Sequence, residues 1–79
     1  MITTLYSVKD ELTQTFLQPA YFNTDEEAKR MFKSQINNIN LWKDNSSDFS
    51  LYKVGTWDNE TGTLIPIIEK IINGRSVLE

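Results

Sequence analysis

One stretch of the chain joins a capping-box signal to helical spacing over several turns, and this predicts a fold with one main helix combined with strands. Thr24 and Glu27 fit a capping box, in which the threonine hydroxyl accepts a hydrogen bond from the backbone N–H three residues later. Apolar residues then recur at every third or fourth position, and asparagines suited to a helix C-cap follow. The pattern predicts a helix over residues 25–38 with the apolar stripe Ala28, Met31, Phe32, Ile36 and Ile39.

The segment before this helix has the period of two that is typical of strands. Residues 2–9 alternate between two faces, with Tyr6 and Val8 on the same face. A polar connection separates them from residues 15–18, which Pro19 ends. Because proline cannot donate to a strand ladder, the second strand is expected to be short and near a sheet edge. The sequence therefore predicts an N-terminal hairpin.

The segment after the helix begins with turn-forming residues over 41–48, which predict a loop. Residues 49–57 then alternate as a strand, in which Gly55 is expected to mark a bulge or a close approach of another backbone. The residues expected on one face of this strand are Phe49, Leu51, Lys53 and Trp57.

A second hairpin is predicted around Gly62, which can supply the positive φ that such a turn needs. Residues 58–62 form the expected turn, and residues 63–65 return as the second arm. The isoleucine-rich segment that follows suits either a helix beginning at Pro66 or a strand, because β-branched residues favour strands and so short a segment has no decisive period. Gly74 is expected to end it.

Together these elements predict an α+β fold in a single domain over residues 1–79. The expected architecture is a small antiparallel sheet of two hairpins packed against one main helix, in the order β-β-α-β-β. The isoleucine-rich C-terminal segment adds a helix or a strand.

Composition excludes several kinds of chemistry. The sequence contains no cysteine and no histidine, so the commonest metal ligands and the usual general base are missing. The acidic pairs Asp44/Asp48 and Asp58/Glu60 fall in predicted turns, where aspartate accepts backbone hydrogen bonds. We therefore expect no metal, no cofactor and no enzymatic activity. There is no signal peptide pattern and no apolar run that could span a bilayer, so a cytoplasmic protein without membrane contact is expected.

Three motifs follow one another between residues 6 and 62. They are Tyr6 to Asp10, the pattern Asp-x-x-Ala-x-Arg-x-Phe over residues 25–32, and Asp-Phe-x-Leu-Tyr-x-x-Gly-x-x-Asp-x-x-Thr-Gly over residues 48–62. They resemble small nonstructural proteins of gokushovirus-type Microviridae, which are tailless single-stranded DNA phages. The resemblance implies a protein made in the host bacterial cytoplasm during infection and absent from the virion. It also implies handling of single-stranded DNA during genome replication or packaging.

Single-stranded DNA is held by basic side chains together with aromatic side chains on which bases stack. The net charge of −3 means that any such site must be local. The same aromatic residues could instead build the core, and Arg30 and Lys33 could form an ordinary solvated helix face. Trp42 is either exposed or a lid over the core. The candidate nucleic-acid-binding residues are Tyr6, Lys9, Arg30, Lys33, Tyr52, Lys53 and Trp57.

The isoleucine-rich segment also offers an apolar surface for a partner. It could pack in the core of the monomer or form a homodimer contact, and a dimer would double a small basic patch. The alternative function is a protein-interaction module that scaffolds capsid assembly or binds a host factor without nucleic acid. The candidate interface residues are Ile67, Ile68, Ile71 and Ile72.

Overall fold

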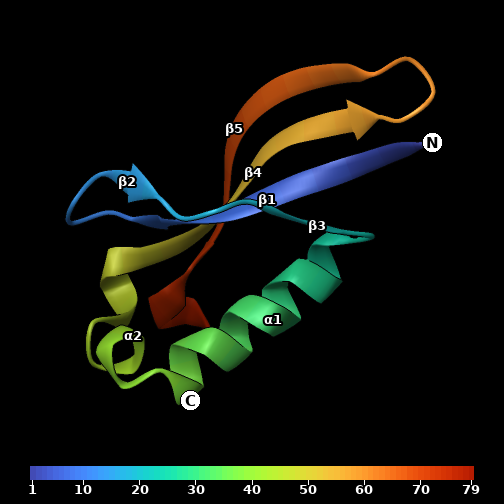
Figure 1. The fold of residues 1–79 in the computed structure, drawn as a ribbon. Coiled ribbons are helices and arrows are strands. Elements are labelled where there is room, and N and C mark those ends of the chain that lie inside the picture. The colour runs from blue at the N-terminus through green and yellow to red at the C-terminus, as the bar shows by residue number, and fades with distance from the viewer.

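The computed structural model describes residues 1–79 and combines one antiparallel sheet with one long helix, which confirms the α+β class (Figure 1). Two one-turn 3-10 helices, Ser46–Asp48 and Gly74–Ser76, flank the C-terminal hairpin. The strands are β1 (Ile2–Asp10), β2 (Thr15–Phe16), β3 (Ala20–Phe22), β4 (Phe49–Asp58) and β5 (Thr63–Asn73), and the α-helices are α1 (Asp25–Asn38) and α2 (Asn40–Asp44).

β1 lies at the centre of the sheet. One side of β1 pairs along its whole length with β4, and β4 pairs in turn with β5. The other side of β1 pairs first with β2 and then with β3. Pro19 lies between these two short strands, where its missing N–H interrupts the ladder. The sequence predicted one strand on this edge, over 15–18, and β3 was not expected.

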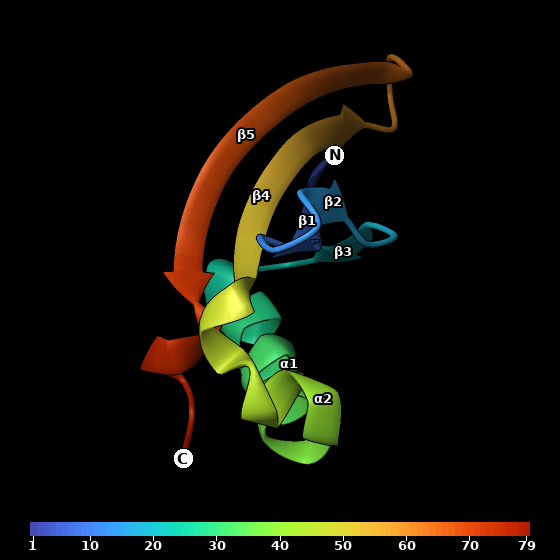
Figure 2. The same cartoon turned by 90° about the vertical axis from the view of Figure 1, so that its left-hand side faces the viewer.

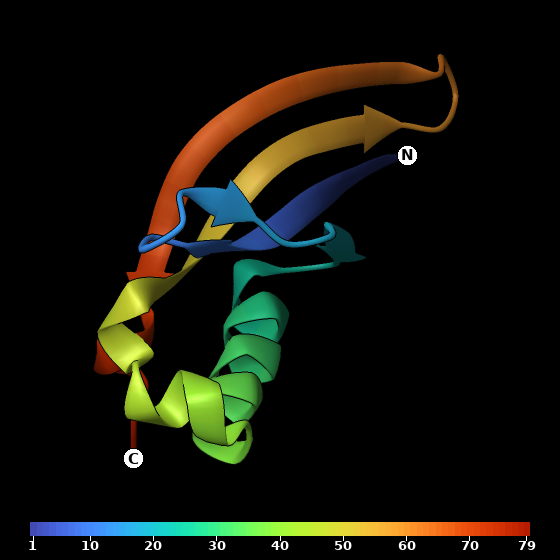
Figure 3. The same cartoon turned by 60° about the vertical axis from the view of Figure 1, so that its left-hand side comes forward.

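The sheet curls, and α1 covers only part of it. Figures 2 and 3 show that β4 and β5 bend strongly and that their hairpin end projects away from α1. The overhang makes the molecule elongated, with extents of 42 × 23 × 16 Å. The free end of the sheet therefore has both faces open.

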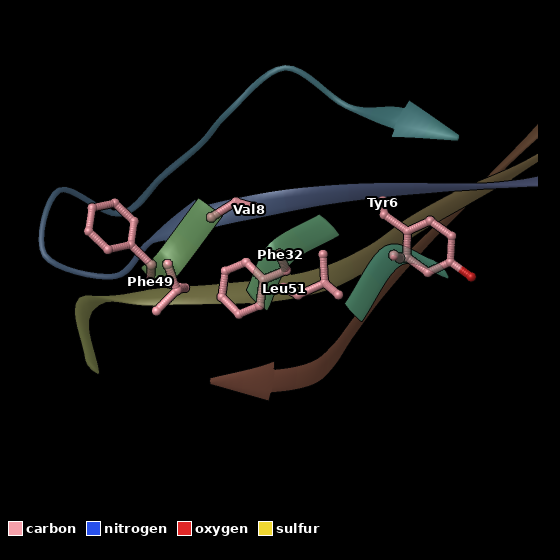
Figure 4. Packing of buried hydrophobic residues seen from close by; sticks show 7 residues of the cluster. Tyr6, Val8, Phe32, Phe49 and Leu51 are labelled. Atoms are coloured by element: carbon pink, nitrogen blue, oxygen red, sulfur yellow. The ribbon is translucent and has the colours of Figure 1, made fainter. Parts of the chain in front are cut away.

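The core lies where α1 packs against β1 and β4. Val8, Phe32 and Leu51 gather there from the two strands and the helix (Figure 4). Phe32 and Ile36 are 1% and 0% exposed. The seven buried apolar residues are Tyr6, Val8, Ala28, Phe32, Ile36, Phe49 and Leu51.

The predicted helix over 25–38 is confirmed at both ends. The Glu27 N–H donates to the Thr24 hydroxyl over 3.2 Å, which is the expected cap. Three acidic residues occupy the first turn, where they interact favourably with the positive end of the helix dipole.

The predicted loop over 41–48 is wrong in part, because most of this segment is helical. It contains α2 and the 3-10 turn Ser46–Asp48. The Trp42 ring stacks on Phe49 with a centroid distance of 4.7 Å. This tertiary contact fixes a one-turn helix whose own sequence has little helical signal, and it makes Trp42 a lid over the core.

The second hairpin forms as expected, with Gly62 at a φ of 72°. Its second arm is much longer than residues 63–65, because β5 continues for 11 residues along β4. The isoleucine-rich segment is therefore a strand, and the helix alternative is wrong. The periodicity of this segment fits both a helix and a strand, and pairing with β4 makes it a strand.

A bulge in β4 reverses one predicted face. β1 pairs Tyr6 with Lys53 and Leu5 with Gly55, so Val54 is an extra residue in β4. Beyond the bulge Trp57 lies on the face opposite Leu51, and the expectation that it shares the core face is wrong. Gly55 is the predicted point of close approach, since a Cβ there would lie 2.9 Å from the Ile65 carbonyl oxygen.

Candidate nucleic-acid interface

The sheet face that points away from α1 carries a row of aromatic side chains. Tyr6 and Val8 of β1 face the helix, so the alternate residues Leu5 and Lys9 point to the opposite side. Partners directly opposite in an antiparallel sheet share a face, and this rule assigns the neighbours of β1 to it. We call this surface the open face, and its main side chains are Thr3, Leu5, Lys9, Phe16, Tyr21, Tyr52, Trp57, Leu64 and Lys70.

One end of the open face holds a cluster of two aromatic rings and a lysine. Phe16 and Tyr52 meet edge to face with ring centroids 5.3 Å apart. The Lys9 Nζ lies 5.4 Å from the Phe16 centroid and 5.6 Å from that of Tyr52. Cation–π attraction of this kind holds the lysine beside the rings rather than in bulk water.

Two lysines and one carboxylate meet in this cluster. Lys9 and Lys70 lie 3.6 and 3.9 Å from the Glu11 carboxylate, which also accepts a hydrogen bond from the Tyr52 hydroxyl over 3.3 Å. Two cations therefore share one anion. A phosphate placed here would meet one net positive charge beside two aromatic rings.

The other end of the open face is an apolar hollow of about 490 Å³. Its walls include Tyr21, which is 69% exposed, and Trp57, which is 39% exposed. Both rings are reachable from solvent, which a stacking contact with a planar ring requires. The remaining lining residues are Thr3, Leu5, Asn59 and Leu64.

Tyr6 and Lys53 lie on the other face of the sheet and do not join this surface. Tyr6 is 2% exposed and donates its hydroxyl hydrogen bond to Asp25 at the start of α1, so its ring has no free face for a base. The expectation that Tyr6 binds nucleic acid is therefore replaced by a core role. Lys53 lies 3.5 Å from Asp25 and 3.9 Å from Glu69, which together neutralise its charge.

In the Tyr6–Asp25–Lys53 group the pKa values of Tyr6 and Asp25 are shifted, and each shift has a clear cause. Burial, followed by the hydrogen bond to Asp25, raises the pKa of Tyr6. The hydrogen bond from Tyr6, followed by the charge of Lys53, lowers the pKa of Asp25 against the opposing effect of its burial. Asp25 is thus held ionised where it links the helix to the sheet.

Arg30 and Lys33 lie on the polar side of α1, away from the sheet. They line a separate polar hollow together with Lys43 of α2. The structure therefore divides the predicted nucleic-acid residues among three places: the open face has Lys9, Tyr52 and Trp57, the helix side has Arg30 and Lys33, and the core side has Tyr6 and Lys53.

The four candidate interface isoleucines also lie in different environments. Ile71 and Ile72 pack against the core cluster, which takes them away from a partner. Ile67 is half-buried and Ile68 is 69% exposed. β5 pairs with β4 along one edge only, so its other backbone edge is open along the strand.

Sequence reasoning missed Phe16, Tyr21 and Lys70. Tyr21 follows Pro19 in a segment too short to show a period, and only its pairing with Leu5 places it on the open face. Lys70 lies in the segment whose secondary structure the sequence left undecided. The clustering of aromatic residues around Pro19 was the one available signal for Phe16 and Tyr21.

The chain is thus a small α+β protein with an aromatic sheet surface that α1 does not cover. Residues 3–77 match the family described as Phage ORF5 protein. The chain belongs to this family, which is a family of phage proteins. No curated protein and no solved structure matches the chain. Neither α-helix combines the length and apolarity needed to cross a membrane.

Proposed function

We propose that this phage protein binds single-stranded DNA on the open face of its sheet. The observation that carries the proposal is the row formed by Phe16, Tyr52, Tyr21 and Trp57 on one solvent-facing surface. Bases stack on such rings with about 1–3 kcal/mol per contact, whatever the base. β1 spans roughly 20 Å from Thr3 to Lys9 at ~3.3 Å per residue, so the row runs along a strand rather than forming a point.

The charge of the open face sets the expected salt dependence. Lys9 and Lys70 can contact about two phosphates, and each contact with a single strand contributes about −0.7 to the slope of log K against log salt. The expected slope is therefore about −1.4 for each monomer. Stacking, rather than charge, supplies most of the affinity.

The test is fluorescence anisotropy of a labelled dT oligonucleotide titrated with the protein at several salt concentrations. The proposal expects saturable binding with this shallow slope. An absence of binding at low salt contradicts it. A slope several times steeper would contradict the assignment to the open face, because that face has too few cations to produce it.

We also infer that the active form is a homodimer joined through β5. The support is an 11-residue strand with one unpaired edge and with Ile65 and Ile68 54% and 69% exposed. An unpaired strand edge presents free N–H and C=O groups that can pair with another strand. Ile68→Lys should yield a monomer in sedimentation experiments, whereas Leu12→Lys adds the same charge in an exposed turn and should leave the dimer intact. A monomeric wild-type protein would contradict the inference.

The order of motifs between residues 6 and 62 supports a gokushovirus-type phage as the source. We propose that the protein acts in the host cytoplasm on the phage genome and is not packaged. Mass spectrometry of purified virions tests this proposal. Recovery of the protein from virions in stoichiometric amounts would contradict it.

A second candidate function is a protein-interaction module for capsid assembly or a host factor. The exposed edge of β5 favours it, because strand addition to an open edge is a common mode of peptide recognition. Absence of DNA binding at low salt, in a monomeric protein whose β5 edge is therefore open, would make this the better account.

A further inference from the structure

A polar hollow of about 400 Å³ lies on the side of α1 that faces away from the sheet. Its lining has no apolar residue and includes three of the protein's basic side chains, Arg30, Lys33 and Lys43. The neutral members are Ser34, Asn37 and Asn38; both asparagine amides already donate to oxygens within the protein, which leaves the Ser34 hydroxyl as the neutral donor for a ligand.

The helix geometry explains why these side chains converge. Residues 30, 33, 34 and 37 share the face of α1 opposite to its buried positions Phe32 and Ile36. α1 ends at Asn38, Ile39 has an extended backbone, and α2 begins after it with the Lys43 N–H donating to the Ile39 carbonyl over 2.8 Å. α2 thereby brings Lys43 back to the end of this polar face.

The hollow is positive in a protein of net charge −3. Its one carboxylate belongs to Glu79, and Lys33 is paired with it over 2.9 Å. Arg30 and Lys43 form no ion pair. Among the side chains, three cations against one anion leave a charge of +2, which exceeds the roughly −0.5 charge that the C-terminal end of α1 contributes.

Asn37 holds the C-terminal segment so that Glu79 reaches the hollow. Its amide nitrogen donates to the Val77 carbonyl over 3.0 Å, and its amide oxygen accepts from the Glu79 N–H over 2.8 Å. Val77 itself packs against the core. The Glu79 side chain, 67% exposed, is thus an anion held beside the cations by a weak surface pair.

We propose that this hollow binds a phosphate group, and that the Glu79 carboxylate occupies the position of that phosphate until it is displaced. Arg30 and Lys43 supply charge without a competing partner, and Lys33 exchanges Glu79 for the ligand. The chemistry fits either a phosphodiester of a nucleic-acid backbone or free phosphate. The site is separate from the open face, so it does not depend on base stacking there.

The test is an NMR titration of the labelled full chain with inorganic phosphate and, separately, with an abasic oligonucleotide, at constant ionic strength. Shifts should concentrate at the amides of residues 30–38 and 43. Arg30→Gln and Lys43→Gln should each weaken binding several-fold. Lys29→Gln is the matched control, because Lys29 lies on the same helix, pairs with Glu26 and does not line the hollow.

Glu79→Gln removes the competing charge and should tighten phosphate binding about two- to fivefold, as expected for loss of a surface ion pair. Tighter binding of the abasic oligonucleotide than of phosphate identifies a nucleic-acid backbone as the ligand, and the reverse order identifies free phosphate. The proposal is overturned if neither probe shifts these amides, or if Arg30→Gln and Lys43→Gln bind as the control does. Binding of dT at the open face by these variants tests the proposed function independently.

Discussion

Replacement of Tyr6 by phenylalanine tests whether Tyr6 is a structural residue that links α1 to the sheet. The change removes only the hydroxyl that donates to Asp25. Hydrogen bonds to charged groups contribute about 1.5–3 kcal/mol, and we take the lower end because the Asp25 side chain is 41% exposed and water can replace the donor. A loss of about 1.5 kcal/mol in a domain of this size lowers Tm by about 6–12 °C.

Thermal unfolding followed by circular dichroism gives the comparison, with Tyr52→Phe as the matched control. The Tyr52 hydroxyl makes a longer bond of 3.3 Å to Glu11, whose carboxylate also contacts Lys9 and Lys70, so its loss should change stability by less than about 0.5 kcal/mol. Equal, small shifts in both variants would refute the reasoning. So would weaker DNA binding by a Tyr6→Phe variant of unchanged stability, which would return Tyr6 to the binding surface.

The same comparison has a predicted pH dependence. The folded protein holds the pKa of Asp25 below its usual 3.8, so the contribution of this carboxylate is present above pH 3.8 and is lost as pH falls through the lower folded value. The difference between wild type and Tyr6→Phe should therefore be largest at neutral pH and shrink in acid. A difference that grows as the pH is lowered would contradict this sign.

Two further substitutions test the core and the β4–β5 pairing. Ile36→Ala should cost about 2–5 kcal/mol in urea unfolding, because Ile36 is a fully buried residue of α1; Met31→Ala, at a half-exposed position of the same helix, should cost far less. Gly55→Ala should push β5 from β4, since the new Cβ would lie 2.9 Å from the Ile65 carbonyl oxygen; faster amide hydrogen exchange in β5 would report it. Equal costs for the two helix variants, or unchanged β5 exchange, would contradict these assignments.

Local sequence signals predicted the elements whose caps, turn residues and apolar patterns all lie within one short segment. The helix over 25–38 has its cap, its acidic first turn and its stripe in one segment, and the second hairpin has Gly62 at its turn. The bulge at Val54 could not be predicted in the same way, because the register of β4 against β1 creates it. That bulge decides whether Trp57 faces the core or solvent.

The same reason explains the divided outcome for the candidate site. Lys9, Tyr52 and Trp57 reach one surface, whereas Tyr6 and Lys53 face α1. One-residue alternation and one bulge separate these groups, and both depend on strand pairing. Tyr21 joins the surface only through its pairing with Leu5, a contact that the short segment around it does not encode.

The central claim is that single-stranded DNA stacks on the aromatic side chains of the open face. Its most direct test is the dissociation constant of a dT oligonucleotide for Trp57→Ala and Tyr21→Ala, measured beside Leu41→Ala, which removes an exposed apolar side chain from α2 instead. At about 1–3 kcal/mol per stacked base, each aromatic substitution should weaken binding roughly 5- to 150-fold while Leu41→Ala binds as wild type. Unchanged affinity in both aromatic variants would contradict the account.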